Sequence, residues 1–291
     1  RSSDLLKTAI CTLWERSAWK KYMKIEDEQG YLIVASNNST DDYIACARVL
    51  AKSIKHNIPC AKVCLLTDTQ INSDVFDYIK VFPYGDQATT DWKLNNDWQV
   101  FEASPFRETI KLEADMIVTS DISHWWDMFR HRDVVIANGC KDFKGNVSVD
   151  RHYRKIFDLN DLPDVYNAIT YWRVSRTAQD FFTLVRDIFN DWDSYKALLK
   201  GANDEIATTD VVYAIASIII GVENVTLPTT YPTLVHMKSK INGITSDDWR
   251  KQLVWELTKT DFRINTVSQQ SPVHYYHKDF AKELEPIYDK F

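Results

Sequence analysis

Two short apolar runs joined by a helical stretch constrain the fold more than any other feature of this sequence. Residues 31–35 and 61–68 are short, largely apolar and bounded by polar turn formers, which is the pattern of buried strands. Residues 44–54 between them read as a helix, with its N-cap among residues 39–41. A strand, a crossover helix and a second strand within about 40 residues form a βαβ unit, which implies a parallel sheet.

The rest of the chain continues this alternation. A leading helix and a charged turn at residues 26–30 are expected before the first strand. Further strands are expected near residues 75–83 (with a short helix at its start), 109–112, 133–137 and 171–174, and further helices near 98–103, 178–192 and 204–220. Residues 138–165 look irregular, and no repeat or linker divides the chain, so we expect one α/β domain over residues 1–291.

Composition supports a globular protein that does not bind nucleic acid through bulk charge. Of the 291 residues, 45% are hydrophobic, which is ample for a large core. The chain carries 35 basic and 41 acidic residues, a net charge of −6. An acidic protein repels a polyanion unless a local basic face exists, and residues 130–132 or 151–155 are the candidates for such a face.

Cysteine content and hydropathy indicate a cytoplasmic protein. The five cysteines are odd in number and lack framework spacing, so reduced thiols are expected. No run of about 18 apolar residues occurs, and no membrane span is expected. The longest apolar stretch, residues 211–222, reads as a buried helix instead. The chain begins without a signal-peptide pattern.

An acidic pair at the end of a strand is the strongest chemical signal. Glu113 and Asp115 follow the expected strand at residues 109–112 and share one face of an extended chain, because side chains alternate. In open α/β sheets, ligands gather at the carboxyl ends of strands. Paired carboxylates there can hold a hard divalent cation, which can bridge two phosphates of a ligand.

This segment resembles the metal-binding motif of GT-A-fold glycosyltransferases, particularly the glycogenin and bacterial galactosyltransferase group (glycosyltransferase family 8). The matching residues are Leu112-Glu113-Ala114-Asp115, the apolar triplet 116–118, then Asp121-Ile122 and an aromatic stretch at 125–129. The resemblance implies a Rossmann-like, mostly parallel central sheet flanked by helices, with a C-terminal acceptor-side extension. Residues 31–137 would bind the nucleotide-sugar, and residues 138–291 would face the acceptor.

The resemblance also implies a bound Mn²⁺ or Mg²⁺. Glu113 stands where the family has its first Asp, and its longer arm could contact the ion through water, so Asp115 is the safer ligand. The family adds a late histidine to the metal and a lysine to the diphosphate. Two segments fit this role and both stay open, His236 with Lys238 and His274 with Lys278.

Donor contacts are implied at several further positions. The first βαβ unit resembles the family's nucleotide-binding start, where a polar residue after the strand contacts ribose or base and a tyrosine stacks on the base. The corresponding residues are Ser36, Asn37 and Tyr43. Lys93 and Ala114 are further candidates for contact with the donor, Lys93 with its sugar or phosphate. The alternative for the first unit is a capped helix with a packed tyrosine.

Candidate catalytic residues come from two segments. Asn167 lies where the family has an Asn-Ser-Gly segment, although Ile169 stands where glycine is usual. Asp204 and Glu205 are expected to open a helix, as the family's acidic pair near the anomeric carbon does. Without the resemblance, these two would be first-turn acids favoured by the helix dipole.

Taken as a whole, the resemblance implies a metal-dependent hexosyl- or pentosyltransferase that uses a nucleotide-sugar, with UDP as the expected nucleotide, and retains anomeric configuration. The sequence as a whole resembles glycosyltransferase-like proteins of tailed bacteriophages. This resemblance implies that the acceptor is a hydroxymethylated DNA base or a sugar already on it. That role needs a pocket for a flipped base, and residues 151–154 could flank one. The host cytoplasm would then be the site of action.

Three alternatives remain open at this point. The acceptor could be a bacterial saccharide or lipopolysaccharide. The chain could bind nucleotide-sugars or carbohydrate without turnover, as the departures at Glu113 and Ile169 suggest. A nucleotidyltransferase would share the sheet and the acidic pair, but residues 36–42 lack the glycine-rich phosphate loop that such an enzyme normally shows.

Overall fold

A six-stranded mixed sheet forms the centre of the molecule, in the order β3-β2-β1-β4-β7-β6. The computed structural model describes residues 23–148, 154–228, 231–239 and 243–291. The strands are β1 Asp27–Val34, β2 Val63–Thr67, β3 Tyr78–Val81, β4 Phe106–Glu113, β6 Val134–Asn138 and β7 Val165–Arg173. The four strands from β3 to β4 are parallel, whereas β7 runs antiparallel to β4 and β6. The expected α/β fold with a flanked central sheet is confirmed.

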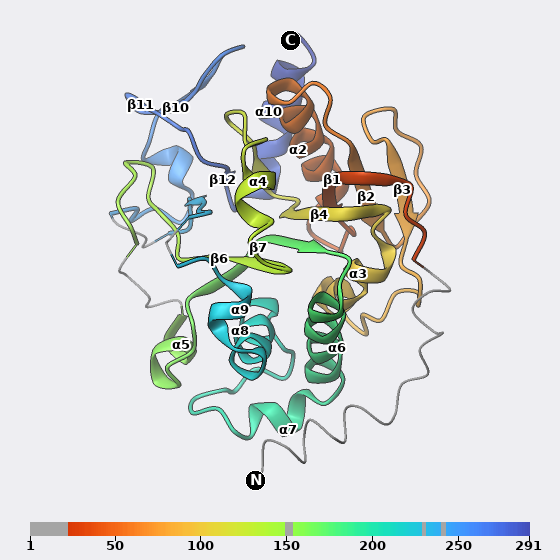
Figure 1. Cartoon of the computed structure of the whole chain (residues 1–291). Helices are drawn as coiled ribbons and strands as arrows, with labels where there is room; N and C mark the ends of the chain where they lie inside the picture. Colours follow the sequence, from red (N-terminus) through yellow and green to blue (C-terminus); the bar gives the residue numbers. More distant parts are fainter. Residues whose placement is uncertain (1–22, 149–153, 229–230, 240–242) are drawn as a thin grey trace.

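Helices cover both faces of this sheet (Figure 1). On one face α2 (Tyr43–Asn57) packs against α10 (Ala281–Tyr288), and on the other α6 (Arg176–Asn190) packs against α8 (Thr209–Ile220). The shorter helices are η2 Lys93–Gln99, α3 Val100–Ala103, α4 Trp125–Phe129, α5 Lys155–Leu159, α7 Trp192–Lys196, α9 Val222–Val225, η4 Trp249–Lys251 and η5 Lys278–Phe280. Within the described ranges, none of the helices has the length and apolar content that crossing a membrane requires.

Alternation along β1 divides the core into two clusters. Leu32 belongs to the cluster on the α6 and α8 side, with Phe106 of β4. Its neighbour Ile33 belongs to the cluster on the α2 side, with Leu50 and Leu112. Because successive side chains of a strand point to opposite faces, a strand covered on both faces reads as a continuous apolar run. That is the pattern by which this strand was predicted.

Two small sheets lie beside the large one. The first has the order β5-β12-β8, with β5 Met116–Ile117, β12 Val273–His274 and β8 Val235–His236. The second has the order β11-β10-β9, with β9 Trp255–Leu257, β10 Phe262–Ile264 and β11 Val267–Ser268. The first small sheet matters for the site, because β5 begins directly after Asp115. It therefore brings both histidine segments to the end of β4.

Several predicted boundaries are wrong. The charged turn at residues 26–30 is the start of β1, because its backbone pairs with β4 from Phe106 onward. No helix precedes β3 between residues 69 and 77. The strand expected at 171–174 begins at Val165, since β7 pairs along both β4 and β6. The predicted leading helix falls largely in residues 1–22, outside the described residues.

The N-cap of α2 and the first residue of α8 also differ from the prediction. The cap of α2 is Asp42, whose carboxylate accepts from the Ala45 N–H at 3.0 Å. Helix α8 begins at Thr209, so Asp204 and Glu205 lie in the preceding non-helical segment rather than in its first turn. The first-turn acid of α8 is Asp210 instead.

The close approach of β1 and β4 at Gly30 generates a stability prediction. A Cβ added at Gly30 would overlap the ring of Phe106, which is fully buried and packs edge-on against Tyr78 at 5.7 Å. We expect Gly30→Ala to lower the free energy of unfolding by about 1–3 kcal/mol, measured by urea denaturation. Adding Phe106→Leu should restore part of the loss, and an unchanged midpoint for Gly30→Ala alone would contradict this packing.

Candidate active site

A pocket of about 540 Å³ opens at the carboxyl ends of β1 and β4. Parallel strands direct the loops that follow them to this edge of the sheet, where ligands bind in open α/β folds. Most of the residues singled out from the sequence line this pocket, namely Ser36, Tyr43, Lys93, Glu113, Ala114, Asp115, Asp204, His236, Lys238, His274 and Lys278. The pocket therefore joins segments that are separated by more than half of the chain.

Three of these side chains form a cluster suited to a divalent cation. One ligand atom each from Glu113, Asp115 and His274 lie within 4.8 Å of one another. His274 Nε2 is 2.9 Å from Asp115 Oδ2 and 3.6 Å from Glu113 Oε2. Two carboxylates and one imidazole match the ligands that Mn²⁺ accepts, and they leave coordination positions for ligand oxygens and water. The donor set thus fits the expected metal.

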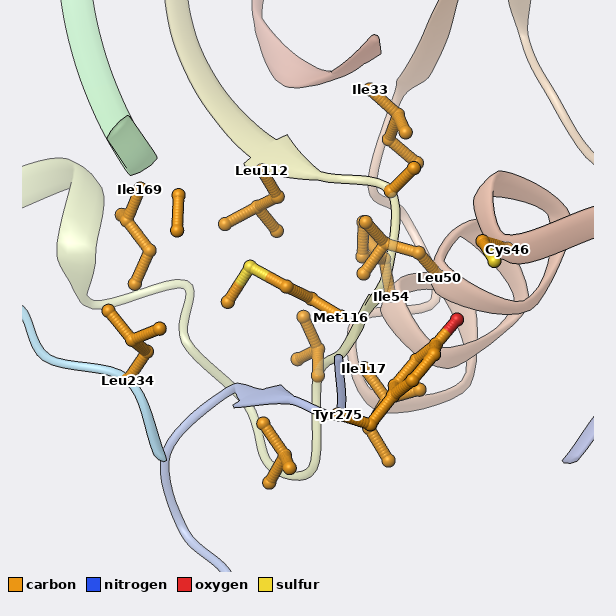
Figure 2. Close-up of a cluster of buried hydrophobic side chains, with 14 of the residues drawn as sticks. Ile33, Cys46, Leu50, Ile54, Leu112, Met116, Ile117, Ile169, Leu234 and Tyr275 are labelled. Atoms are coloured by element: carbon orange, nitrogen blue, oxygen red, sulfur yellow. The ribbon is translucent and has the colours of Figure 1, made fainter. Parts of the chain in front are cut away.

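Buried neighbours hold these ligands in place. Met116 follows Asp115 and Tyr275 follows His274, and both are fully buried in the α2-side core. Figure 2 shows the side chain of Met116 within this hydrophobic core, between Leu112 and Ile117. Because side chains alternate along extended chain, anchoring one residue in the core directs its neighbour to the pocket. In this segment the two acids therefore face the pocket, and the apolar triplet at residues 116–118 packs in the core.

The charges of the cluster influence one another strongly. Burial raises the pKa of Glu113 to about 7, with the adjacent Asp115 adding to this and His274 opposing it. Burial also opposes ionisation of Asp115, but His274 and Lys278 lower the pKa of that carboxyl below its usual range. Burial alone would lower the pKa of His274, whereas the carboxylate of Asp115 raises it. Ionisation of Glu113 is thus disfavoured beside Asp115, and a cation bound by both carboxylates would offset their repulsion.

His236 lies behind His274 rather than among the clustered ligands. The two residues are paired in register between β8 and β12, and their rings stack with centroids 4.6 Å apart and planes 9° apart. Burial, followed by the charge of His274, holds the pKa of His236 well below its usual value. Within the described residues, the one group able to supply three metal ligands contains His274 and not His236.

On the opposite side of the pocket, the donor-binding candidates take different positions. Ser36 is buried at the end of β1 and lines the pocket, as does Tyr43, whose pKa burial raises to about 12. The Asn37 amide oxygen instead accepts from the Ile44 N–H at 3.0 Å, so this side chain supports the start of α2. Lys93 Nζ lies 2.6 Å from Asp86 and 3.5 Å from Asp68.

The catalytic candidates are placed apart from one another. Asp204 lines the pocket, and Glu205 is exposed and does not. Asn167 is buried below the pocket, where its amide oxygen accepts from Lys111 Nζ at 2.6 Å. Lys111 also pairs with Asp97, and the Tyr213 hydroxyl donates to the other oxygen of Asp97 at 2.6 Å. This buried network connects β4, β7, η2 and α8.

Asp210 and Arg154 are among the pocket residues that were not singled out as site residues from the sequence. Asp210 in the first turn of α8 accepts from the Asn167 backbone N–H at 2.8 Å. Arg154 is buried beside it, pairs with Asp164, and lies 3.6 Å from the Phe157 ring and 4.0 Å from the Tyr166 ring. Acidic residues are so common in the first turn of a helix that the position of Asp210 in the sequence does not by itself indicate a site. Arg154 was noted only as part of a basic segment, whose residues 151–153 lie outside the described ranges.

Comparisons with known proteins identify the fold. No protein-family model matches the chain, and no curated protein matches it. Its structure is similar to that of the galactosyltransferase LgtC in complex with donor and acceptor sugar analogues, with a TM-score of 0.51 and 13% identity over 91% of this chain and 96% of LgtC. It is also similar to the bifunctional glycosyltransferase WbbM, with a TM-score of 0.50 and 10% identity over 91% of this chain and 50% of WbbM.

At these identities the likeness establishes the architecture. The central mixed sheet with helices on both faces is that of GT-A glycosyltransferases, as the sequence predicted. The chain spans nearly all of LgtC but only half of WbbM. The resemblance to the glycogenin and bacterial galactosyltransferase group in particular remains a prediction.

The buried Lys111 ammonium generates a second stability prediction. Lys111→Met should lower the free energy of unfolding by about 3–5 kcal/mol, because it leaves the Asp97 carboxylate buried without a cation. Chemical denaturation measures the effect. The matched control is Lys80→Met, which breaks an exposed pair with Glu26 at 2.6 Å and should cost less than about 1 kcal/mol.

The double variant Lys111→Met with Asp97→Leu sharpens this test. It removes both charges, so it should recover much of the stability that Lys111→Met loses. Equal effects of Lys111→Met and Lys80→Met would contradict the importance of the buried pair.

Proposed function

We propose that this chain is a metal-dependent glycosyltransferase that takes a sugar from a nucleotide-sugar, with UDP as the nucleotide. The observation that carries the proposal is the cluster of Glu113, Asp115 and His274, with Lys278 Nζ 2.9 Å from Asp115, at the strand ends of a GT-A sheet. Membership of the glycogenin and bacterial galactosyltransferase group is part of this proposal. So is retention of anomeric configuration, which that resemblance implies.

The metal and the lysines have complementary roles in this proposal. A Mn²⁺ or Mg²⁺ ion held by Glu113, Asp115 and His274 would neutralise charge on the departing diphosphate. Lys278 and Lys238, which both line the pocket, offset the remaining phosphate charge. Such preorganised charges favour the transition state because they are already oriented when the glycosidic bond breaks.

The remaining pocket residues suit the nucleoside and the sugar. Ser36 follows β1 and Tyr43 begins α2, and both line the pocket where the base and ribose would bind. Asp204, Asp210 and Lys93 line the part of the pocket left for the transferred sugar. Residues 31–137 then form most of the donor side and residues 138–291 the acceptor side, with the segment around His274 crossing to the metal.

For the acceptor, we favour a bacterial saccharide or lipopolysaccharide over DNA. The net charge of −6 opposes binding of a polyanion. Arg154, one of the residues expected to flank a flipped base, is buried and paired with Asp164. Its charge is therefore already compensated within the protein. A hydroxymethylated base in phage DNA is the competing acceptor.

A thermal-shift experiment tests the donor site. With Mn²⁺ present, one nucleoside diphosphate or nucleotide-sugar should raise the melting temperature, since binding at a hundredfold excess over Kd stabilises by about 2.7 kcal/mol. The double variant Glu113→Ala with Asp115→Ala should remain folded, lose this shift and lose turnover. Its control removes two exposed acids, Asp127→Ala with Asp193→Ala, whose side chains are 88% and 91% exposed.

The outcomes separate the candidate functions. Full activity of the Glu113 and Asp115 double variant would refute the metal site. Metal-dependent binding without hydrolysis or transfer of the sugar would favour a binding protein without turnover. If no nucleotide changes the melting temperature of the well-folded protein, the proposed donor site is refuted.

A second experiment distinguishes the acceptors. Transfer from the identified donor should occur with saccharide acceptors, and affinity for duplex DNA should be weak at all salt concentrations. Tight DNA binding that falls steeply with salt, together with sugar transfer to hydroxymethylated DNA, would reverse the choice. Filter binding across a salt series and mass spectrometry of the products measure these two quantities.

A further inference from the structure

Tyr276 adopts a backbone conformation that its side chain disfavours. Its φ is 68°, in the left-handed region. The other non-glycine residues with positive φ in the described ranges are Asp161 and Asn265, residue types that tolerate this region. A bulky aromatic residue there is a genuine outlier, and such strain concentrates at functional sites. Tyr276 lines the pocket, two residues after His274.

The strained residue makes the turn that returns the chain to the metal cluster. The His277 N–H donates to the Tyr275 carbonyl at 2.8 Å, so Tyr276 is the central residue of a γ-turn with positive φ. The Tyr276 carbonyl then accepts from Lys278 Nζ at 2.7 Å. The same ammonium lies 2.9 Å from Asp115 Oδ2. The turn thereby fixes where Lys278 sits.

The ring of Tyr276 also connects the two lysines of the pocket. Lys278 Nζ lies 4.7 Å from the ring centroid and Lys238 Nζ lies 5.4 Å from it. Both distances are within the range of cation–π attraction. Lys238 follows β8 and Lys278 follows β12, and these strands are parallel neighbours. One aromatic ring thus contacts two like charges in a single pocket, and its attraction for both opposes their mutual repulsion.

We propose that Tyr276 is a positioning residue for diphosphate recognition: its strained turn and its ring hold Lys238 and Lys278 beside Asp115 as a two-lysine clamp. The inference rests on the proposed function, in which a nucleoside diphosphate leaves. An ammonium has three donors, and Asp115 and the Tyr276 carbonyl engage two of those of Lys278, which leaves one for a phosphate oxygen. Charge-assisted hydrogen bonds of this kind are the strong ones.

Inorganic pyrophosphate in the presence of Mg²⁺ is the probe, and calorimetry measures its Kd. Tyr276→Gly permits the positive φ but removes the ring, so it should raise Kd about tenfold without lowering the melting temperature of the free protein. Tyr276→Phe keeps the ring and should keep Kd within about twofold of wild type. The control Asp161→Gly relieves positive φ away from the pocket and should leave Kd unchanged.

If Tyr276 had a merely structural role, its substitution would change the Kd and the melting temperature together. A raised Kd with an unchanged melting temperature therefore indicates a positioning role. Wild-type affinity in Tyr276→Gly overturns the inference, as does an equal loss in Tyr276→Phe and Tyr276→Gly. Absence of pyrophosphate binding by the wild-type protein overturns it as well. Tyr276-dependent binding of pyrophosphate in a protein that consumes no nucleotide-sugar would sink the proposed glycosyl transfer and leave the clamp standing.

Discussion

One buried ammonium organises the part of the molecule on which the pocket is built. Lys111 lies on β4, two residues before Glu113, and it is almost fully enclosed. A cation in such a place is tolerated only when fixed partners surround it. Asp97 and Asn167 are those partners, and Tyr213 in turn binds Asp97. Since these residues come from four elements, the requirement to satisfy one charge sets the mutual positions of β4, η2, β7 and α8.

The cluster of Glu113, Asp115 and His274 follows a different rule, in which apolar residues position polar ones. Asp115 and His274 are each followed by a residue buried in the α2-side core, as Figure 2 shows for Met116 and Tyr275. The short sheet β5-β12-β8 then places His274 opposite Met116. Core packing and backbone pairing thus align these side chains, and they hold the carboxylates of Glu113 and Asp115 close despite the repulsion between them.

Prediction from the sequence succeeded for strands that a local apolar run marks. It failed where pairing between distant strands determines the structure. The apolar runs at 31–35 and 61–68 became β1 and β2, because strands buried on both faces need continuous apolar residues. The charged residues 26–30 were placed in a turn, yet they extend β1, since edge-to-edge pairing with β4 satisfies their backbone. Asp204 and Glu205 were placed in a helix that begins only at Thr209.

The sequence by itself determined the α/β class, the acidic pair at a strand end and a set of candidate side chains most of which line the pocket, because each depends on residues near one another in the chain. Only the tertiary structure decided which of His236 and His274 joins the candidate metal cluster, since each segment pairs a histidine with a following lysine. It also revealed the strain at Tyr276. Strand register and long-range contacts settle such questions, and no local pattern encodes them.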